Sequence, residues 1–357
     1  MALYRIFPSQ DSSIYSEFVT TNTGRDELLE IGRYSSGGDY KTIRSLIQFD
    51  TSEIQNVINN KSNKELLGAT LNLKLNFAQE LPTSFTVEAK ALTQAWVEGV
   101  GKFGDSPINT TGCSWNKRNA SDDWSTPWGG TFKIFNTNSG LGQNITVSGS
   151  QDFNKNSNYD ISIGVGGAMT EWYSGSLSNN GFVLKLDDST EGSSANSIRL
   201  KYFGSDTNTI YPPYLEIRWR DYTHSPGTLP ALTDPEAVIT IKNNKGEYKD
   251  EGKIRFRLHA RPKYPTRTFV TSSAFVKNHY LPTTSYWGLK DEFTEEMSVD
   301  FDTNYTQISC DSNSSFFDIH MDGLEPERYY RLLVKTTIDG NDMIIDNDQV
   351  FKITRNG

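Results

Sequence analysis

Two tryptophans in one glycine-flanked loop are the side chains best suited to chemistry at a surface. The stretch Trp124-Ser-Thr-Pro-Trp-Gly-Gly130 contains Trp124 and Trp128, whose flat rings could stack on sugar rings. Ligand sites combine such apolar faces with a few placed polar groups, and Asn119, Asp122 and Asp123 could supply them. One hypothesis is therefore a glycan platform. The competing hypothesis is that both tryptophans pack under their own loop or against a neighbouring subunit.

Paired carboxylates are the residues that could serve catalysis. Asp122–Asp123 and Asp187–Asp188 are adjacent acids, and glycoside hydrolysis uses two acids that flank the scissile bond. Adjacent residues of an extended strand point to opposite faces, and both pairs lie in turn-like sequence, so we interpret them as solvated loops. Motifs of serine hydrolases, zinc proteases and phosphate-binding loops do not occur in the sequence.

Two further motifs resemble ligand sites, but each lacks a feature that the site requires. Gly99-Val-Gly-Lys-Phe-Gly104 has dinucleotide-turn spacing, but Asp105–Gly112 cannot form the helix that would have to follow it. Asp339-Gly-Asn-Asp342 and Asp346-Asn-Asp348 are rich in oxygen ligands but lack the remaining spacing of a calcium loop, so we predict a hairpin turn. The four histidines are scattered, and the alternation places His259 and His320 toward solvent. We expect no catalytic residues, no cofactor and no metal, and hence no enzyme.

The composition excludes other classes of partner. The 357 residues carry a net charge of -9, and without a basic block we expect no nucleic-acid binding. No apolar run reaches the roughly 18 residues that suggest a membrane helix, and the N-terminus lacks the apolar segment of a signal peptide. We therefore expect neither membrane insertion nor a signal peptide. Cys113 and Cys310 are expected to be reduced and buried.

Short period-2 stretches must form the scaffold that positions these residues. Leu71–Phe77 alternates apolar and polar residues, and similar stretches recur between turn-forming clusters. Such spacing predicts an all-β protein built from two β-sandwiches, with short helical turns at Ser52–Asn59 and Ala168–Tyr173. Residues 223–236 contain three prolines and no strand period, which predicts a Pro-rich linker. It would join a module at 1–222 to another at 237–357.

An ordered series of motifs carries a family resemblance in the first module. Its most specific members are Phe49-Asp50, Ala95-Trp-Val-Glu-Gly-Val-Gly101, Cys113-Ser-Trp-Asn116 and Asn180-Gly-Phe182. This series resembles the DNRLRE-type domain, a β-sandwich found in bacterial surface proteins, some carbohydrate-binding modules and phage virion proteins. The resemblance implies a jelly-roll-like sandwich. Large aromatic residues where strand ends meet loops would close one end of its core, so we expect structural roles for three tryptophans: Trp96, Trp115 and Trp172.

The second module contains the spacing of a tyrosine corner. In Leu324-Glu-Pro-Glu-Arg-Tyr-Tyr330 the phenol of Tyr330 would bond back to the backbone and fix the turn into a strand. This region is similar to the last strands of a fibronectin type III domain. Lys263–Trp287 departs from that pattern, because it is long and lacks alternation. We predict that it forms a partner-contact arm, whose aromatic residues would be Phe269, Phe275, Tyr280, Tyr286 and Trp287.

The combination of the two modules suggests a function by analogy. A fibronectin-like module fused to a DNRLRE-type module looks like structural proteins of tailed bacteriophages. The resemblance implies a non-enzymatic virion protein of the tail, neck or baseplate, made in the host cytoplasm. It would form a symmetric multi-copy assembly with other virion proteins. The alternative is a carbohydrate-binding module or adhesin that recognises a host surface glycan. Weaker alternatives are a capsid decoration or fibre protein and a polysaccharide-degrading enzyme.

Overall fold

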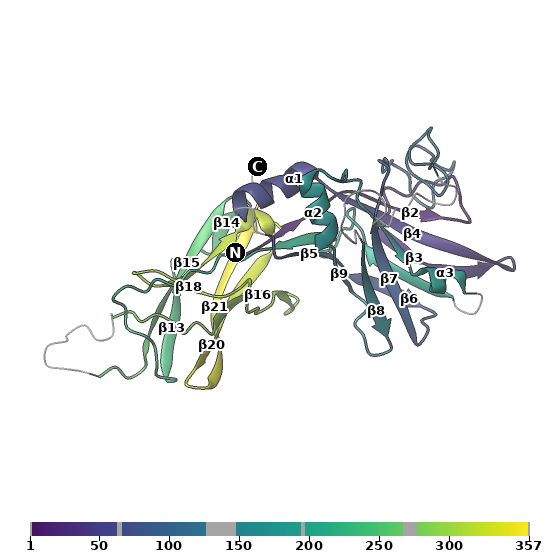
Figure 1. Ribbon diagram of the computed structural model, residues 1–357. Coiled ribbons are helices and arrows are strands. Elements are labelled where there is room, and N and C mark those ends of the chain that lie inside the picture. The colour runs from purple at the N-terminus through teal and green to yellow at the C-terminus, as the bar shows by residue number, and fades with distance from the viewer. Residues whose placement is uncertain (1, 63–65, 126–147, 194–196, 267–276, 356–357) are drawn as a thin grey trace. The chain divides into compact units, whose positions relative to one another are not determined.

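The chain folds into β-sheets that form two compact units. The computed structural model describes residues 2–62, 66–125, 148–193, 197–266 and 277–355, and strands dominate it (Figure 1). Contacts define an N-terminal unit, Arg5–Ile217, and a C-terminal unit, Arg218–Gly357 together with Met1–Tyr4. The all-β class predicted from the alternation is thus confirmed. Within the described residues no helix has the length and apolar character needed to cross a membrane.

The first twelve strands form two sheets. One sheet has the order β1-β12-β5-β9, and the other has the order β6-β11-β3-β4-β10-β7-β8, with β2 pairing with β4 beside that path. The strands are β1 (Leu3–Ile6), β2 (Pro8–Tyr15), β3 (Leu28–Ser36), β4 (Asp39–Phe49), β5 (Gly68–Leu73), β6 (Leu75–Gln79), β7 (Ser84–Ala91), β8 (Ser148–Asn154), β9 (Ile161–Gly164), β10 (Phe182–Leu186), β11 (Ile198–Phe203) and β12 (Tyr214–Arg218).

The alternating stretch Leu71–Phe77 does not form a single strand. It is divided between β5 and β6, which belong to different sheets. Leu71 and Leu73 are buried, as a half-buried strand requires, but Phe77 is 46% exposed. The reason is that β6 is the last strand at one end of the larger sheet and pairs only with β11. The alternation of apolar and polar residues continues in β6, but no described part of the chain covers Phe77.

Short helices connect several of the strands. Both expected helical turns are present, as α1 (Thr51–Asn56) with η1 (Val57–Lys61) and as α2 (Gly166–Ser174). The Asp50 carboxylate caps α1 by accepting hydrogen bonds from the backbone N–H groups of Ser52 and Glu53.

The acid pair Asp187–Asp188 is solvated as expected, with the Asp188 side chain 85% exposed, but it lies at the start of a short helix and not in a loop. Asp187 accepts hydrogen bonds from the backbone N–H groups of Ser189 and Thr190 and so caps α3 (Asp188–Gly192). Asp188 forms an ion pair, 2.8 Å long, with the buried ammonium of Lys185. The two carboxylates therefore stabilise a helix end and do not form an acid–base pair.

The remaining strands form the two sheets of the C-terminal unit. Their orders are β13-β15-β19-β18 and β14-β21-β20-β16-β17, which is an immunoglobulin-like arrangement. The bounds are β13 (Ala237–Lys242), β14 (Glu247–Lys249), β15 (Lys253–Pro262), β16 (Ser285–Asp291), β17 (Met297–Val299), β18 (Ser309–Cys310), β19 (Ser315–His320), η2 (Met321–Gly323), β20 (Tyr329–Ile338) and β21 (Asn341–Thr354).

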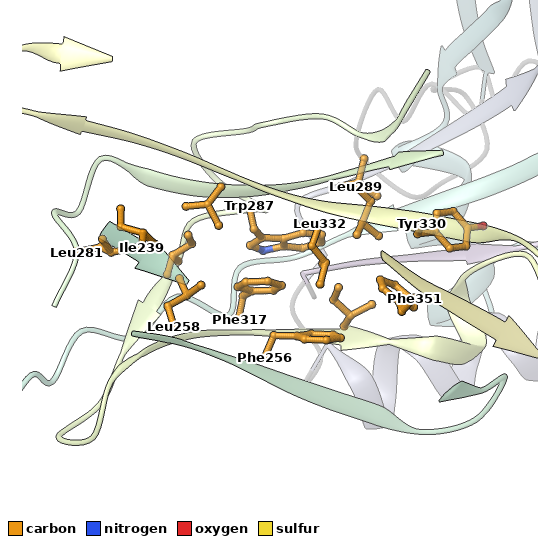
Figure 2. Close-up of a cluster of buried hydrophobic side chains, with 14 of the residues drawn as sticks. Ile239, Phe256, Leu258, Leu281, Trp287, Leu289, Phe317, Tyr330, Leu332 and Phe351 are labelled. Carbon is orange, nitrogen blue, oxygen red and sulfur yellow. The ribbon is translucent and has the colours of Figure 1, made fainter. Parts of the chain in front are cut away.

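Aromatic packing fills the space between these two sheets. The Trp287 ring stacks on Phe317, with centroids 5.4 Å apart and an interplanar angle of 9°, and Figure 2 shows them among Phe256, Leu332 and Phe351.

The tyrosine corner has the geometry that its spacing predicts. The Tyr330 side chain is buried, its hydroxyl donates to the Glu325 carbonyl (3.3 Å), and the same oxygen lies 3.2 Å from the Glu325 backbone N–H.

The Pro-rich segment 223–236 belongs to the C-terminal unit and is not a free tether. Thr223 and Ser225 exchange backbone hydrogen bonds with Cys310, and Leu232 bonds to Tyr280. Leu232 is also a buried member of the core. Proline removes N–H donors but leaves every carbonyl available, so the segment can still pair irregularly with a sheet edge.

His320 differs from its predicted solvent-facing position, because its side chain is 7% exposed. The rings of Tyr4 and Trp219 pack against it, with centroid separations of 6.2 and 5.9 Å. Alternation identified one face of β19 as polar, but it could not show that distant residues cover that face.

Candidate functional site

The predicted glycan platform is not present in the described residues. Trp124 is 4% exposed, its indole N–H donates to the Ser114 carbonyl (3.0 Å), and it packs in one cluster with Trp96 and Trp115. A ring covered on both faces cannot stack on a sugar, so Trp124 is a packing residue. Trp128 lies outside the described residues.

The polar residues proposed for that platform bond to each other and to the neighbouring side chains of Lys117 and Arg118. Asn119 donates to Asp122 (2.9 Å), Arg118 pairs with Asp122, and Lys117 pairs with Asp123 (2.9 Å). The hydrogen bond from Asn119 and the charge of Arg118 lower the pKa of Asp122. The structure thus brings Asn119 and Asp122 together, but in a turn whose polar side chains already have hydrogen-bond and ion-pair partners within it.

The tryptophans assigned to structural roles are all buried in the N-terminal unit. Trp96 is 4% exposed and donates its indole N–H to the Asn180 carbonyl. Trp115 and Trp172 are 3% exposed; Arg44 lies over the Trp115 ring, and Trp172 contacts Phe182.

The predicted contact arm is part of the C-terminal sandwich wherever the structure describes it. Trp287 and Tyr286 lie in β16, and Trp287 is 1% exposed. Tyr280 pairs with Ala231 and is half-buried. These residues correct the arm prediction, since the rings of Trp287 and Tyr280 contact Phe317 and His224 and Tyr286 belongs to a paired strand. Phe269 and Phe275 lie outside the described residues.

A buried asparagine to which the sequence assigned no role organises one group of loops. Asn22 is fully buried, and its amide donates to the carbonyls of Glu98 (2.6 Å) and Cys113 (2.9 Å). Its side-chain oxygen accepts the Gly101 N–H (2.8 Å). One side chain therefore connects three loop segments, and the nearby glycines were the available signal.

The glycines around Asn22 permit this close packing. A Cβ at Gly99 would lie 2.3 Å from the Asn22 side-chain oxygen, and one at Gly112 would lie 2.3 Å from the Glu98 carbonyl oxygen. Gly99 also has φ +87, a conformation that favours glycine. Loop packing thus explains Gly99 and Gly101 of the spacing that mimicked a nucleotide fingerprint, whereas a Cβ at Gly104 would meet nothing within 4 Å.

Five apolar side chains are exposed on the segments that Asn22 holds. We call them the loop surface: they are 39% to 59% exposed and comprise Phe18, Val97, Val100, Phe103 and Ile108. The Phe18 and Phe103 rings meet edge to face at 5.2 Å, over Tyr15, which lies 4.9 Å from Phe103. Grouped apolar side chains held in fixed positions are typical of interaction surfaces.

Carboxylates lie beside the Phe103 end of the loop surface. Asp26 accepts the Phe103 N–H (3.2 Å), and Glu27 pairs with Lys102 (2.7 Å). Arg25 pairs with Asp206 (3.1 Å). Burial raises the pKa of Asp26, whereas the hydrogen bond from Lys102 lowers the pKa of Glu27.

A buried carboxyl group supports these loops from β2. The Asp11 side chain is 1% exposed and accepts the Ser205 N–H (2.7 Å), while the Asp11 N–H donates to the Glu98 carboxylate (2.9 Å). Desolvation is the main reason that the pKa of Asp11 is raised to about 7, and the nearby Glu98 and Asp206 charges add to it.

Replacing Asp11 by asparagine is expected to change how stability depends on pH. An acid with a raised pKa stabilises the fold fully below its unfolded pKa, and that contribution is lost as pH rises toward the folded value near 7. Between about pH 5 and pH 8 the wild type should therefore lose roughly 3 kcal/mol of unfolding free energy relative to Asp11→Asn. Urea unfolding at both pH values measures the difference, and parallel losses in the two proteins would contradict it.

The C-terminal unit contains a small polar cavity. Its volume is about 190 Å³, and its wall includes Lys253, Arg255 and Asp318. Arg255 holds Asp318 through two hydrogen bonds of 2.8 and 3.0 Å. Burial opposes ionisation of Asp318, but the Arg255 hydrogen bonds and neighbouring positive charges lower its pKa overall. A general acid needs the opposite shift, so Asp318 is poorly suited to glycoside hydrolysis.

Metal and thiol chemistry have no evident site in the described segments. In those segments no three or more His, Cys, Asp or Glu side chains are grouped to hold a metal ion. Cys113 and Cys310 are free and buried, and burial raises the pKa of the Cys113 thiol to about 12.

Comparisons with known proteins give little guidance. No protein-family model matches the chain, and no curated protein matches it. Among solved structures, one similar chain is a DUF4785 family protein from Legionella pneumophila, with TM-score 0.18 and 7% identity, covering 99% of this chain and 62% of that one. Another is the adhesin domain of Epf from Streptococcus pyogenes, with TM-score 0.19 and 9% identity, covering 99% and 92%. The chain thus spans less than two thirds of the Legionella protein, and neither likeness carries an argument about function.

Proposed function

We propose that this chain is a non-enzymatic structural protein of a tailed-bacteriophage virion, in the tail, neck or baseplate region, and that it acts through protein–protein contacts. The observation that carries the proposal is the loop surface, where five apolar side chains are exposed on loops fixed by Asn22. The assignment to a virion rests on the family resemblance of the two modules and is an analogy.

The rigidity of the loop surface supports a contact function. Association costs free energy whenever loops must be ordered. Here the hydrogen bonds of Asn22 and the close glycine contacts already fix the backbone before any partner binds. Interfaces are also enriched in aromatic residues at their centre, and Phe18 and Phe103 supply two that touch each other.

Glycan recognition has less support, because Trp124 is buried. A capsid decoration or fibre role would use the same kind of contact and differs only in its place on the particle. Immunogold labelling of purified particles with an antibody against this chain distinguishes these roles. Label at the tail, neck or baseplate supports the proposal, label on the head supports the decoration role, and absence from particles contradicts both.

Removing the aromatic pair is expected to impair incorporation into particles. In a phage that lacks the gene and is complemented in trans, the double variant Phe18→Ser with Phe103→Ser should lower the copies per particle by about tenfold or more. The matched control is Phe77→Ser, since Phe77 is 46% exposed on β6 and lies outside the loop surface. Quantitative mass spectrometry of purified particles measures the copies, and equal incorporation of both variants would contradict a contact role for the loop surface.

A further inference from the structure

We propose that the loop surface docks a basic protein surface, one that places arginine or lysine side chains around apolar residues, and not a second copy of this chain. This inference rests on the proposed function and specifies the chemistry of the partner. It follows from the excess of acidic residues on the loops that carry the apolar side chains, and from the fact that the two basic residues there are already paired with acids.

The apolar residues lie on segments that are packed side by side. A Cβ at Gly101 would lie 2.9 Å from the Asn109 Cβ, and a Cβ at Gly99 would lie 2.6 Å from the Gly112 Cα. Segments 97–101 and 109–112 therefore run next to each other; Val97 and Val100 belong to the first, and Ile108 directly precedes the second. Phe103 follows on the same loop and its ring touches Phe18, so the aromatic pair is the part of the loop surface in which the side chains are in contact.

The charge of these segments is predominantly negative. Segments 17–27, 97–113 and 204–206 together contain six acidic residues and two basic ones. Both cations already have acidic partners: Lys102 pairs with Glu27 (2.7 Å) and Arg25 pairs with Asp206 (3.1 Å). Asp26 and Asp105 bond to backbone N–H groups, which carry no net charge: Asp26 accepts from Phe103, and Asp105 accepts from Lys102. Glu17 and Glu98 lie near the charges of Lys41 and Arg25, so Asp26 and Asp105 are the acids left for a partner.

This excess argues against a second copy as the occupant. A two-fold dimer brings the same patch of both copies together, so the acids of one would face the acids of the other. Like charges across an interface cost several kcal/mol, while opposite charges steer association. Arginine is the best match, because its guanidinium pairs with carboxylates and also stacks on aromatic rings such as Phe18 and Phe103.

Defined peptides test the preference of the full-length protein. The probes are amphipathic peptides of equal length that alternate leucine with arginine, glutamine or glutamate, and isothermal titration measures each Kd. We expect the arginine peptide to bind at least about tenfold tighter than the glutamate peptide, with the glutamine peptide between them. Raising the salt concentration from about 50 mM to about 300 mM should raise the Kd of the arginine peptide more than the Kd of either other peptide. Equal affinities for all three peptides would overturn the inference.

Two opposite charge changes locate the binding. Glu27→Lys should raise the Kd of the arginine peptide by about threefold or more, and Lys102→Glu should lower that Kd by a similar factor. The exchanged pair, Glu27→Lys with Lys102→Glu, retains the net charge and should bind nearly as the wild type does. Phe18→Ser with Phe103→Ser should weaken binding, whereas Phe77→Ser should not. If the charge variants have no effect, or if Phe77→Ser weakens binding equally, the peptide binds elsewhere and the inference fails.

Sedimentation equilibrium tests the competing occupant. A dimer that dissociates in the Phe18→Ser, Phe103→Ser variant would show that the loop surface pairs with a second copy, and it would overturn the basic-partner inference. This outcome is separable from failure of the proposed function. Arginine preference without presence in particles would contradict the virion role alone, and presence in particles without charge preference would contradict the basic partner alone.

Discussion

Replacing Asn22 by aspartate is expected to lower the free energy of unfolding by about 4 kcal/mol. The change removes the two amide hydrogens that reach the carbonyls of Glu98 (2.6 Å) and Cys113 (2.9 Å). It also places a carboxylate beside those carbonyl oxygens at a fully buried position. The bond accepted from the Gly101 N–H would survive, so the loss reports on the donors and on the buried charge.

A matched control lies in the same group of loops. Asn109 uses its side-chain oxygen to accept hydrogen bonds from the backbone N–H and the hydroxyl of Thr111, and aspartate can accept both. Asn109→Asp should therefore change the unfolding free energy by less than about 1 kcal/mol. Urea unfolding measures both variants, and hydrogen exchange should show faster opening of residues 97–113 in Asn22→Asp alone. Equal stability of the two variants would contradict the organising role of Asn22.

Replacing Trp287 by alanine is expected to cost about 4 kcal/mol of unfolding free energy in the C-terminal unit. The indole is 1% exposed and stacks on Phe317 between the two sheets (Figure 2). Its removal leaves a cavity that the surrounding strands cannot fully close. An aromatic residue on an arm awaiting a partner would instead be dispensable for folding.

Tyr264 is the matched control, since it lies in the same aromatic-rich stretch but is 71% exposed. Tyr264→Ala should change stability by less than about 0.5 kcal/mol. Thermal unfolding followed by near-ultraviolet circular dichroism compares the two variants. If Trp287→Ala unfolds at the same temperature as the wild type, the interpretation of Trp287 as part of a contact arm would be restored.

Both corrections concern aromatic residues in stretches that lack regular alternation. Trp124 and Trp287 were expected to present a ring to a ligand or a partner, and the structure buries both. Phe18 and Phe103, to which the sequence assigned no role, remain exposed and in contact, as do Phe293 and Tyr329. A sequence shows that a loop contains a ring, but whether the ring is covered depends on segments far away in the chain.

The sequence by itself determined the sheet-built class and the tyrosine corner. Both follow from short-range rules, because side chains alternate with period two along a strand and the Tyr330 hydroxyl reaches Glu325, only five residues away. Only the tertiary structure decided which loops form a surface. The amide of Asn22 bonds to residues 76 and 91 positions along the chain, and no local pattern encodes such a contact. The loop surface exists because folding brings those distant carbonyls to one buried side chain.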